Sequence, residues 1–243
     1  MTPIIAVANN KGGVGKTTTT VHIAYLLSQR GVRVLCVDMD TQANLLAHLF
    51  PFKILRTAQE MGTSEAQVTV FKRSETLAVL PFSFWEATQT EYSKTIQRYA
   101  QDYDVILVDC PPSLETRTLA ALDVASHILI PTHLERLSVM GLRRLVQEIE
   151  KRSIEILGVF PTMIERTSPN QSAWLEQLQA NYAAALLDVQ IPTSRIFSSA
   201  VTQAQTAFEY NGKKKNPSLD AYQTITNTIF ERLFNGTENS HSR

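Results

Sequence analysis

A glycine-rich segment that follows a short apolar run constrains the fold of this chain more than any other feature. The apolar run contains Ile4, Ile5 and Val7, and residues 11–18 read KGGVGKTT before a long amphipathic stretch. A buried strand, a glycine loop and a helix, in this order, form the context that a phosphate-binding loop requires. The glycines allow backbone N–H groups to turn toward one point, and the positive end of the helix favours an anion there.

We expect this loop to bind the phosphates of a nucleotide. In the phosphate-loop pattern, Lys16 supplies a point charge for the outer phosphates and Thr17 supplies a hydroxyl for Mg²⁺. The strict pattern G-x-x-x-x-G-K-[ST] is not met, because Asn10 occupies the place of its first glycine. The expected phosphate contacts are Lys11, Gly12, Gly13, Val14, Gly15, Lys16, Thr17 and Thr18.

Strand and helix signals alternate along the chain, which predicts an α/β fold with a mostly parallel twisted sheet and helices on both faces. We expect one domain over residues 1–243, with disorder at about 236–243. Residues 50–75 show no clear pattern. The expected strands are 32–37, 76–80, 104–108, 127–130, 154–160 and a short one near 185–191. The expected helices are 15–30, 42–49, 84–101, 114–125, 134–152, 171–181, 199–209 and 218–234.

Carboxylates follow two of the predicted strands. In a parallel sheet, ligands sit at the carboxyl ends of the strands, so residues 10–18, 38–40 and 109–112 should meet at one site. Asp109 ends an apolar strand and would hold Mg²⁺ through its water shell, with Thr17 as a direct ligand. The alternative for a lone aspartate at a strand end is a cap on the next helix. We interpret Gln42 and Asn44 as helix-capping residues, with a role as switch residues as the alternative.

The motif KGGVGKTT resembles the deviant phosphate-binding loop of the ParA/MinD family of ATPases. The stretch VLCVDMDTQANLL resembles the second signature of that family, which reads close to DxDxQxN. The resemblance covers essentially the whole chain and implies a P-loop NTPase fold with ATP and Mg²⁺ as cofactors. It implies that Asp40 positions or activates the attacking water, and that Asp38 supports Mg²⁺ and the nucleotide. The sequence does not divide these two roles.

The same resemblance implies that Lys11 reaches the ATP of a second subunit in a homodimer, much as an arginine finger does. Residues 131–142 look like the family region that senses the nucleotide and faces the partner subunit; His133 within it reads as a satisfied loop residue. The positions at which members of this family bind adenine correspond to Thr162, Met163, Ile191 and Pro192.

The likeness is closest to ParA proteins without an N-terminal helix-turn-helix domain. This implies a cytoplasmic, nucleoid-associated ATPase whose ATP-bound dimer binds DNA without sequence preference. A ParB-like or adaptor protein would then stimulate hydrolysis and release, to position a plasmid, a chromosome or a protein body such as a carboxysome. Lys+Arg and Asp+Glu are both 23, so DNA contact requires a local patch. Candidates are Arg166, Arg195, Lys213, Lys214 and Lys215, with a solvated loop as the alternative for the lysine run.

Two other functions compete with this one. Residues 229–236 resemble the amphipathic membrane-targeting end of MinD, which would make the protein a membrane-surface ATPase. Against this, Glu231 cancels the charge of Arg232, and the segment continues a stripe of core residues, so we expect core packing and no membrane partner. A metal-cofactor role, which paired cysteines near the dimer seam would support, is disfavoured because Cys36 and Cys110 are isolated and read as buried residues.

Overall fold

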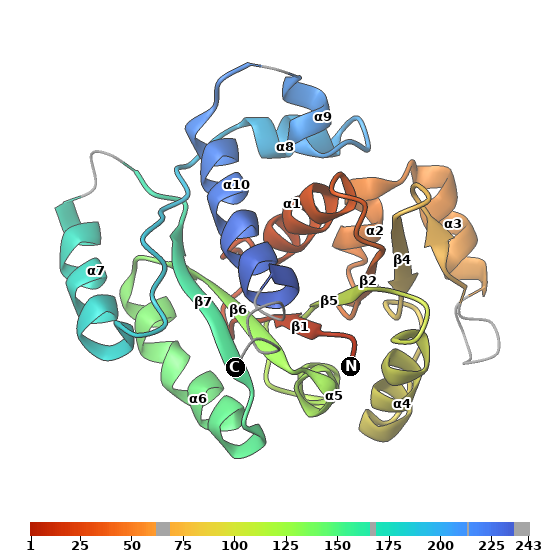
Figure 1. Cartoon of the computed structure of the whole chain (residues 1–243), viewed down its shortest axis with the longest axis horizontal. Helices are drawn as coiled ribbons and strands as arrows, with labels where there is room; N and C mark the ends of the chain where they lie inside the picture. The colour runs from red at the N-terminus through yellow and green to blue at the C-terminus, as the bar shows by residue number, and fades with distance from the viewer. Residues whose placement is uncertain (62–68, 166–168, 213, 236–243) are drawn as a thin grey trace, which may run out of the picture.

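A seven-stranded sheet forms the centre of the computed structural model (Figure 1), which describes residues 1–61, 69–165, 169–212 and 214–235. The strand order is β3-β4-β2-β5-β1-β6-β7. All neighbouring pairs are parallel except β3 and β4. The strands are β1 (Ile4–Val7), β2 (Val34–Asp38), β3 (Phe71–Lys72), β4 (Leu77–Pro81), β5 (Val105–Asp109), β6 (His127–His133) and β7 (Glu155–Thr162).

The central strands are apolar except for the aspartates that end β2 and β5, because both faces of the sheet are covered. Every residue of β1, β2, β4 and β5 is buried. Successive side chains enter different cores: Ile4 and Ala6 pack into one cluster, and Ile5 and Val7 into the other. The predicted fold class is therefore confirmed.

Helices form a layer on each face of the sheet (Figure 1). One layer contains α4 (Gln89–Tyr99), α5 (Thr116–Val124), α6 (Arg136–Arg152) and α7 (Pro169–Tyr182). The other contains α1 (Lys16–Ser28), α2 (Asn44–Leu49) and α10 (Pro217–Phe230), with a π-helical turn over Glu231–Asn235 at the end of α10. The remaining helices are α3 (Phe52–Met61), α8 (Ile196–Val201) and α9 (Ala207–Asn211).

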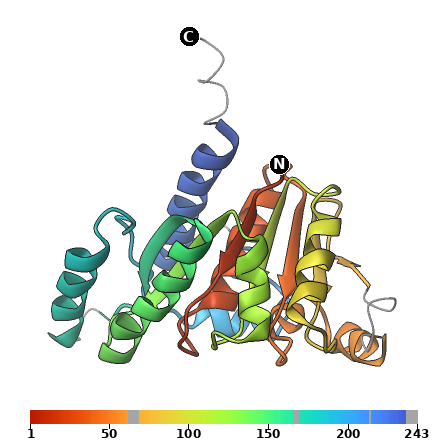
Figure 2. The same ribbon diagram turned by 90° about the horizontal axis from the view of Figure 1, so that it is seen from below.

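Figure 2 shows that the N-terminus and the end of α10 lie at one edge of the molecule, and α8 and α9 at the opposite edge. The strands run toward the edge occupied by α8 and α9, so this is where the carboxyl ends of the parallel strands meet. No helix in the described part of the chain is both long and apolar enough to cross a membrane.

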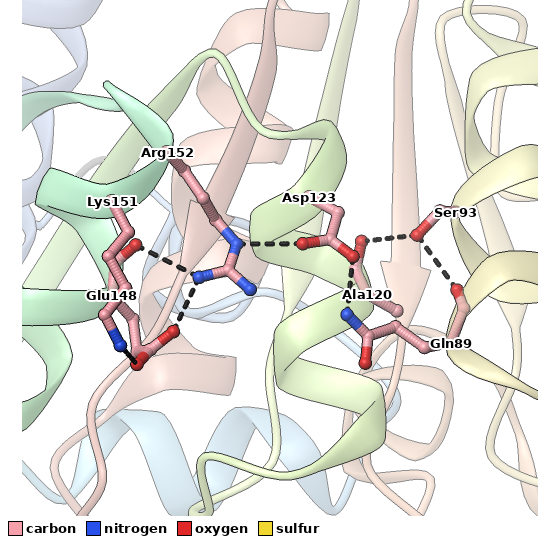
Figure 3. A network of polar contacts seen from close by, with 7 residues as sticks. All are labelled: Gln89, Ser93, Ala120, Asp123, Glu148, Lys151 and Arg152. Atoms are coloured by element: carbon pink, nitrogen blue, oxygen red, sulfur yellow. Dashed lines mark hydrogen bonds and ion pairs between the residues drawn. The ribbon is translucent and has the colours of Figure 1, made fainter.

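A polar network ties the three helices α4, α5 and α6 together (Figure 3). Asp123 on α5 accepts hydrogen bonds from Gln89 Nε2 of α4 at 2.6 Å and from Arg152 Nε of α6 at 2.8 Å. Arg152 also binds the Glu148 carboxylate at 2.6 Å within α6. These contacts lie outside the predicted site and serve the packing of one layer.

The structure corrects three predicted elements. Residues 50–75, where no element was expected, contain α3, of which only Ala58 is fully buried, and β3, which has two residues. The helix expected over 199–209 is two short helices, because Ala204 adopts a φ of 50° and Thr206 begins α9 with a capping box to Glu209. The strand expected near 185–191 forms a single isolated bridge to β7, between Leu186 and Val159, since its backbone bonds to Val159 and Pro161 leave no continuous ladder.

Candidate functional site

The glycine loop after β1 turns into α1 and forms one wall of a cavity of about 410 Å³. Gly13 and Gly15 have φ angles of 75° and 86°, which only glycine adopts without a steric cost. Gly15 is the N-cap of α1, so the first N–H groups of that helix remain available to an anion. The cavity is lined by Gly12, Gly13, Gly15, Lys16, Thr17, Thr18, Asp40, Asn44, His48, Pro112, Met163, Phe197, Ser198 and Val201.

Lys16 is almost fully buried at the base of this cavity, with 7% of its surface exposed. Its Nζ donates to the carbonyl oxygen of Lys11 at 2.9 Å, which draws the loop around the ammonium group. Burial lowers the pKa of Lys16, and the nearby Asp109 carboxyl acts in the opposite direction. A poorly solvated cation in this position is suited to an anionic ligand.

Thr17 and Asp109 meet beneath the glycine loop. The Thr17 hydroxyl donates to Asp109 Oδ2 at 2.7 Å, and Asp109 is fully buried at the end of β5. Burial, reinforced by neighbouring Asp38, raises the pKa of Asp109 well above its usual range. A hydroxyl and a carboxylate beside a phosphate cradle fit Mg²⁺, which takes few protein oxygens and shares the rest of its shell with phosphate and water.

The two carboxylates at the carboxyl end of β2, Asp38 within the strand and Asp40 after it, have different environments. Asp38 is fully buried, and its oxygens accept the backbone N–H groups of Asp40 at 3.2 Å and Leu46 at 3.1 Å. Burial raises the pKa of Asp38 to about 7. Asp40 lines the cavity, and its carboxylate accepts the N–H of Gln42 at 3.0 Å.

The cap expected from Gln42 or Asn44 is wrong. The N-cap of α2 is Ala43, with a φ of 52° and no side-chain hydrogen bond. The first turn of α2 is instead satisfied from outside the helix, because Asp38 accepts the N–H of Leu46. Asn44 lines the cavity.

Lys11 lies in an ion pair with Glu135, at the start of α6. The Glu135 carboxylate also lies 3.2 Å from His133 Nδ1 at the end of β6. A second contact joins the loop to α6, since Asn10 Nδ2 donates to the Gly141 carbonyl at 3.3 Å. The side chain of Lys11 is therefore held by residues of its own chain.

A second cavity of about 320 Å³ adjoins the glycine loop and shares Gly15 and Thr18 with the first. It is lined by all four residues predicted to hold adenine, namely Thr162, Met163, Ile191 and Pro192. The Thr162 hydroxyl donates to the Val14 carbonyl at 2.9 Å, which joins β7 to the loop.

His133 also lines the second cavity, and its Nδ1 lies 3.2 Å from the Glu135 carboxylate. The aromatic residues Phe197 and Tyr222, which the sequence analysis did not select, complete the walls. They come from α8 and α10, far along the chain, so no local pattern marks them.

The predicted basic candidates are only partly described. Arg166 and Lys213 lie outside the described residues. Arg195 is exposed at the N-cap of α8, and Lys214 and Lys215 are exposed before α10. The Ser218 hydroxyl donates to the Pro192 carbonyl at 3.0 Å, so the segments that carry Arg195 and Lys215 are joined beside the second cavity.

A buried aromatic cluster behind the loop was not predicted. His22 of α1 lies 2.6 Å from the Thr18 carbonyl through Nδ1, and its Nε2 accepts the N–H of Ala207 at 3.0 Å. Its ring stacks on Tyr222 and meets His48 edge-on, with centroid distances of 5.2 and 5.6 Å. This cluster connects the phosphate loop with α8 and α9. An isolated histidine in a helix gives no signal for such a contact.

A glycine loop at the carboxyl end of β1, with a buried lysine and a hydroxyl–carboxylate pair beneath it, defines the P-loop NTPase class. The family model described as an AAA domain matches residues 2–156 of this chain. The sporulation initiation inhibitor protein Soj of Bacillus subtilis (strain 168) is 30% identical over 241 residues, which cover 90% of this chain and 95% of Soj.

Two further comparisons agree with the P-loop class. The chromosome partitioning protein ParA of Caulobacter vibrioides (strain NA1000 / CB15N) is 29% identical, with 94% of each chain covered. The septum site-determining protein MinD of Pyrococcus horikoshii OT3, solved with Mg-ADP, superposes with a TM-score of 0.77 over 99% of this chain and 100% of its own, at 22% identity. The chain belongs to the ParA/MinD family of P-loop ATPases.

Proposed function

We propose that this protein is a Mg²⁺-dependent ATPase of the ParA type that uses ATP to control a dimer on DNA. The observation that carries the ATPase proposal is the Thr17–Asp109 pair, 2.7 Å apart, beneath a loop that also buries Lys16. The phosphates would lie along residues 11–18, and the base in the cavity lined by Thr162, Met163, Ile191 and Pro192.

Mg²⁺ would be held by Thr17 and, through water, by Asp109, with Asp38 supporting the site. When bound, the ion neutralises charge on the outer phosphates. Asp40 would orient the attacking water, because it is the carboxylate after β2 that lines the phosphate cavity. Lys16 would contact the outer phosphates of its own chain's nucleotide. The products would be ADP and phosphate.

The homodimer proposal rests on exposed apolar residues of α6, at the same edge of the sheet as the glycine loop. Leu137 and Met140, in the first turns of α6, are 75% and 62% exposed. They lie two and five residues after Glu135, which forms the ion pair with Lys11. Exposed large apolar residues beside a functional site favour a protein contact, and a second copy would bring its own Lys11 to the facing nucleotide.

DNA binding would use the segments that flank α8 and α9. The proposed contacts are Arg195, Lys214 and Lys215, together with Arg166 and Lys213. A dimer doubles the number of contacts between the protein and DNA phosphates. Each contact releases a counterion, so the logarithm of the binding constant falls by about 0.9 per contact for each tenfold rise in salt. At moderate salt, twice as many contacts therefore give much tighter binding. The ATP-bound protein would then be cytoplasmic and nucleoid-associated, until a ParB-like or adaptor protein stimulates hydrolysis.

The C-terminal segment supports this proposal over a membrane-surface role. Ile225 and Ile229 are 0% and 1% exposed, and the rings of Phe230 and Phe234 lie 5.2 Å apart and pack against the same core. An anchor helix of this kind would have to leave the core, at a cost of roughly 1.5–3 kcal/mol for each large apolar side chain. Packing against the core was the expectation for this segment.

A combined sizing and retention experiment tests the proposal. The purified protein, with Mg²⁺ and ATP, ADP or no nucleotide, is run on a sizing column with light scattering and then applied to immobilised random-sequence duplex DNA. We expect a dimer and DNA retention only with ATP. A variant with glutamates at Lys213, Lys214 and Lys215 should still dimerise with ATP but elute from DNA at lower salt. Vesicles containing anionic lipid serve as the competing surface, and ATP-dependent sedimentation with them in place of DNA retention would contradict the proposal.

A further inference from the structure

Arg117 of α5 binds three backbone carbonyls in two loops at the carboxyl edge of the sheet. Its Nη1 donates to the oxygens of Met39 at 3.2 Å and Phe82 at 2.7 Å, and its Nη2 donates to that of Trp85 at 2.8 Å. The guanidinium also lies over the ring of Tyr92, 5.1 Å from the centroid. A planar guanidinium can serve several carbonyls at fixed angles, which a lysine ammonium cannot reproduce.

Met39 lies between Asp38, the last residue of β2, and Asp40. The Met39 N–H donates to the Asp109 carbonyl at 3.1 Å, and the Asp38 carbonyl accepts the N–H of Phe82 at 2.9 Å. The hydrogen bond from Arg117 restrains the Met39 carbonyl, which belongs to the peptide that joins Met39 to Asp40. Asp40 comes directly after this anchored peptide, and it lines the phosphate cavity.

We propose that Arg117 is a positioning residue for Asp40. By holding the Met39–Asp40 peptide against the loop after β4, its guanidinium orients the Asp40 carboxylate toward the phosphate end of the cavity. A displacement of about 1 Å in a group that orients a reactant can cost about 10²-fold in rate, whereas binding by the glycine loop does not depend on that group. This inference rests on the proposed role of Asp40 in ATP hydrolysis.

The test compares Arg117→Met, which removes the donors, with Arg117→Lys, which retains one charged donor. Single-turnover hydrolysis and affinity for a fluorescent ATP analogue are measured with Mg²⁺. We expect Arg117→Met to slow hydrolysis by about 10- to 100-fold with nucleotide affinity within about twofold, and Arg117→Lys to recover part of the rate. The matched control is Arg232→Met, because Arg232 makes the same kind of bond, to the Leu157 carbonyl at 2.9 Å, and lies outside the site. Equal loss of rate and affinity would overturn the positioning role.

A double variant separates this inference from the proposed function. If Arg117 acts through Asp40, then Arg117→Met adds no further loss of rate in an Asp40→Asn background. A normal rate in Asp40→Asn alone would reject the proposed role of Asp40. A slow Asp40→Asn together with a normal Arg117→Met would reject only the positioning role.

Hydrogen exchange provides a readout that does not depend on activity. The N–H groups of Gln42 and Ala43 bond to the side chain and the carbonyl of Asp40. We expect these two amides to exchange faster in Arg117→Met, while those within α5 keep their protection. Unchanged exchange at Gln42 and Ala43 would overturn the inference even if the rate of hydrolysis fell.

Discussion

Lys11 and Glu135 form an ion pair within one chain, which keeps the lysine proposed to act on a second subunit close to its own loop. The two side chains are 32% and 37% exposed. A pair this accessible to water contributes about 1 kcal/mol at most. The contact is therefore weak enough for a partner's triphosphate to replace, and strong enough to bias an equilibrium between monomer and dimer.

Replacing Glu135 with glutamine removes the negative partner of Lys11. We expect the fraction of dimer at limiting ATP to rise, with an association constant up to about 30-fold higher, because each of the two monomers loses up to about 1 kcal/mol of competing interaction. Light scattering across an ATP titration measures this. The control is Glu148→Gln at the far end of the same helix, where the carboxylate binds Arg152 (Figure 3). Similar dimer formation in both variants would contradict the expectation.

Replacing Lys11 with alanine should separate nucleotide binding from assembly. Lys16 and the backbone of the glycine loop remain, so affinity for ATP should change little. ATP-dependent dimers and stimulated hydrolysis should be lost, because the cation proposed to cross to the second subunit is absent. An arginine-finger cation contributes roughly 10³–10⁵ in rate in other phosphoryl-transfer enzymes. Normal ATP-dependent dimers would exclude this role for Lys11.

The exposed apolar residues of α6 provide a test of the assembly face. We expect Met140→Glu to weaken the ATP-dependent dimer by at least about tenfold, because it places an unpaired carboxylate in a contact that should exclude water. Nucleotide binding by the monomer should be unchanged. Phe52→Glu is the control, since Phe52 is also exposed, at 76%, but lies on α3, away from the cavity. Sedimentation velocity with ATP distinguishes the two variants.

The buried histidines predict how stability depends on pH. Burial lowers the pKa of His22 to about 3 and that of His48 to about 4, from an ordinary value of 6.5. At these two side chains the unfolded chain therefore binds more protons below about pH 6.5, so their contribution to stability falls as the pH falls from there toward about 4. The raised pKa of Asp38, about 7, acts in the opposite direction over the same range. Each histidine contributes a loss of about 1.4 kcal/mol per pH unit.

His48→Phe should roughly halve this contribution to the slope. The Nε2 of His48 has no hydrogen-bond partner among the described residues, so its replacement leaves no polar group behind. Denaturant unfolding at pH 8 should therefore be close to that of the unmodified protein, and at pH 5 the variant should be the more stable by about 1–2 kcal/mol. An unchanged slope would mean that His48 is not the neutral buried group described here.

Much of the site could be predicted from short stretches of sequence. The glycine loop, Thr17 and Asp109 lie next to strands whose apolar runs are unambiguous, and parallel strands bring their carboxyl ends to one edge. The errors have separate causes. The amphipathic period of α3 was not recognised, and the break between α8 and α9 depends on a left-handed Ala204. Helix α2 has no side-chain cap of its own, and the N–H of Leu46 in its first turn bonds to Asp38, six residues before the helix.

By itself, the sequence determined the alternating fold and the phosphate cradle, because backbone freedom at glycine and burial of apolar strands are local properties. Only the tertiary structure decided that Asp38 is enclosed while Asp40 lines the cavity, that Lys11 is paired with Glu135, and that Arg117 anchors Met39. Each of these contacts joins residues brought together by chain folding, and their charge and hydrogen bonding depend on neighbours that no sequence spacing specifies.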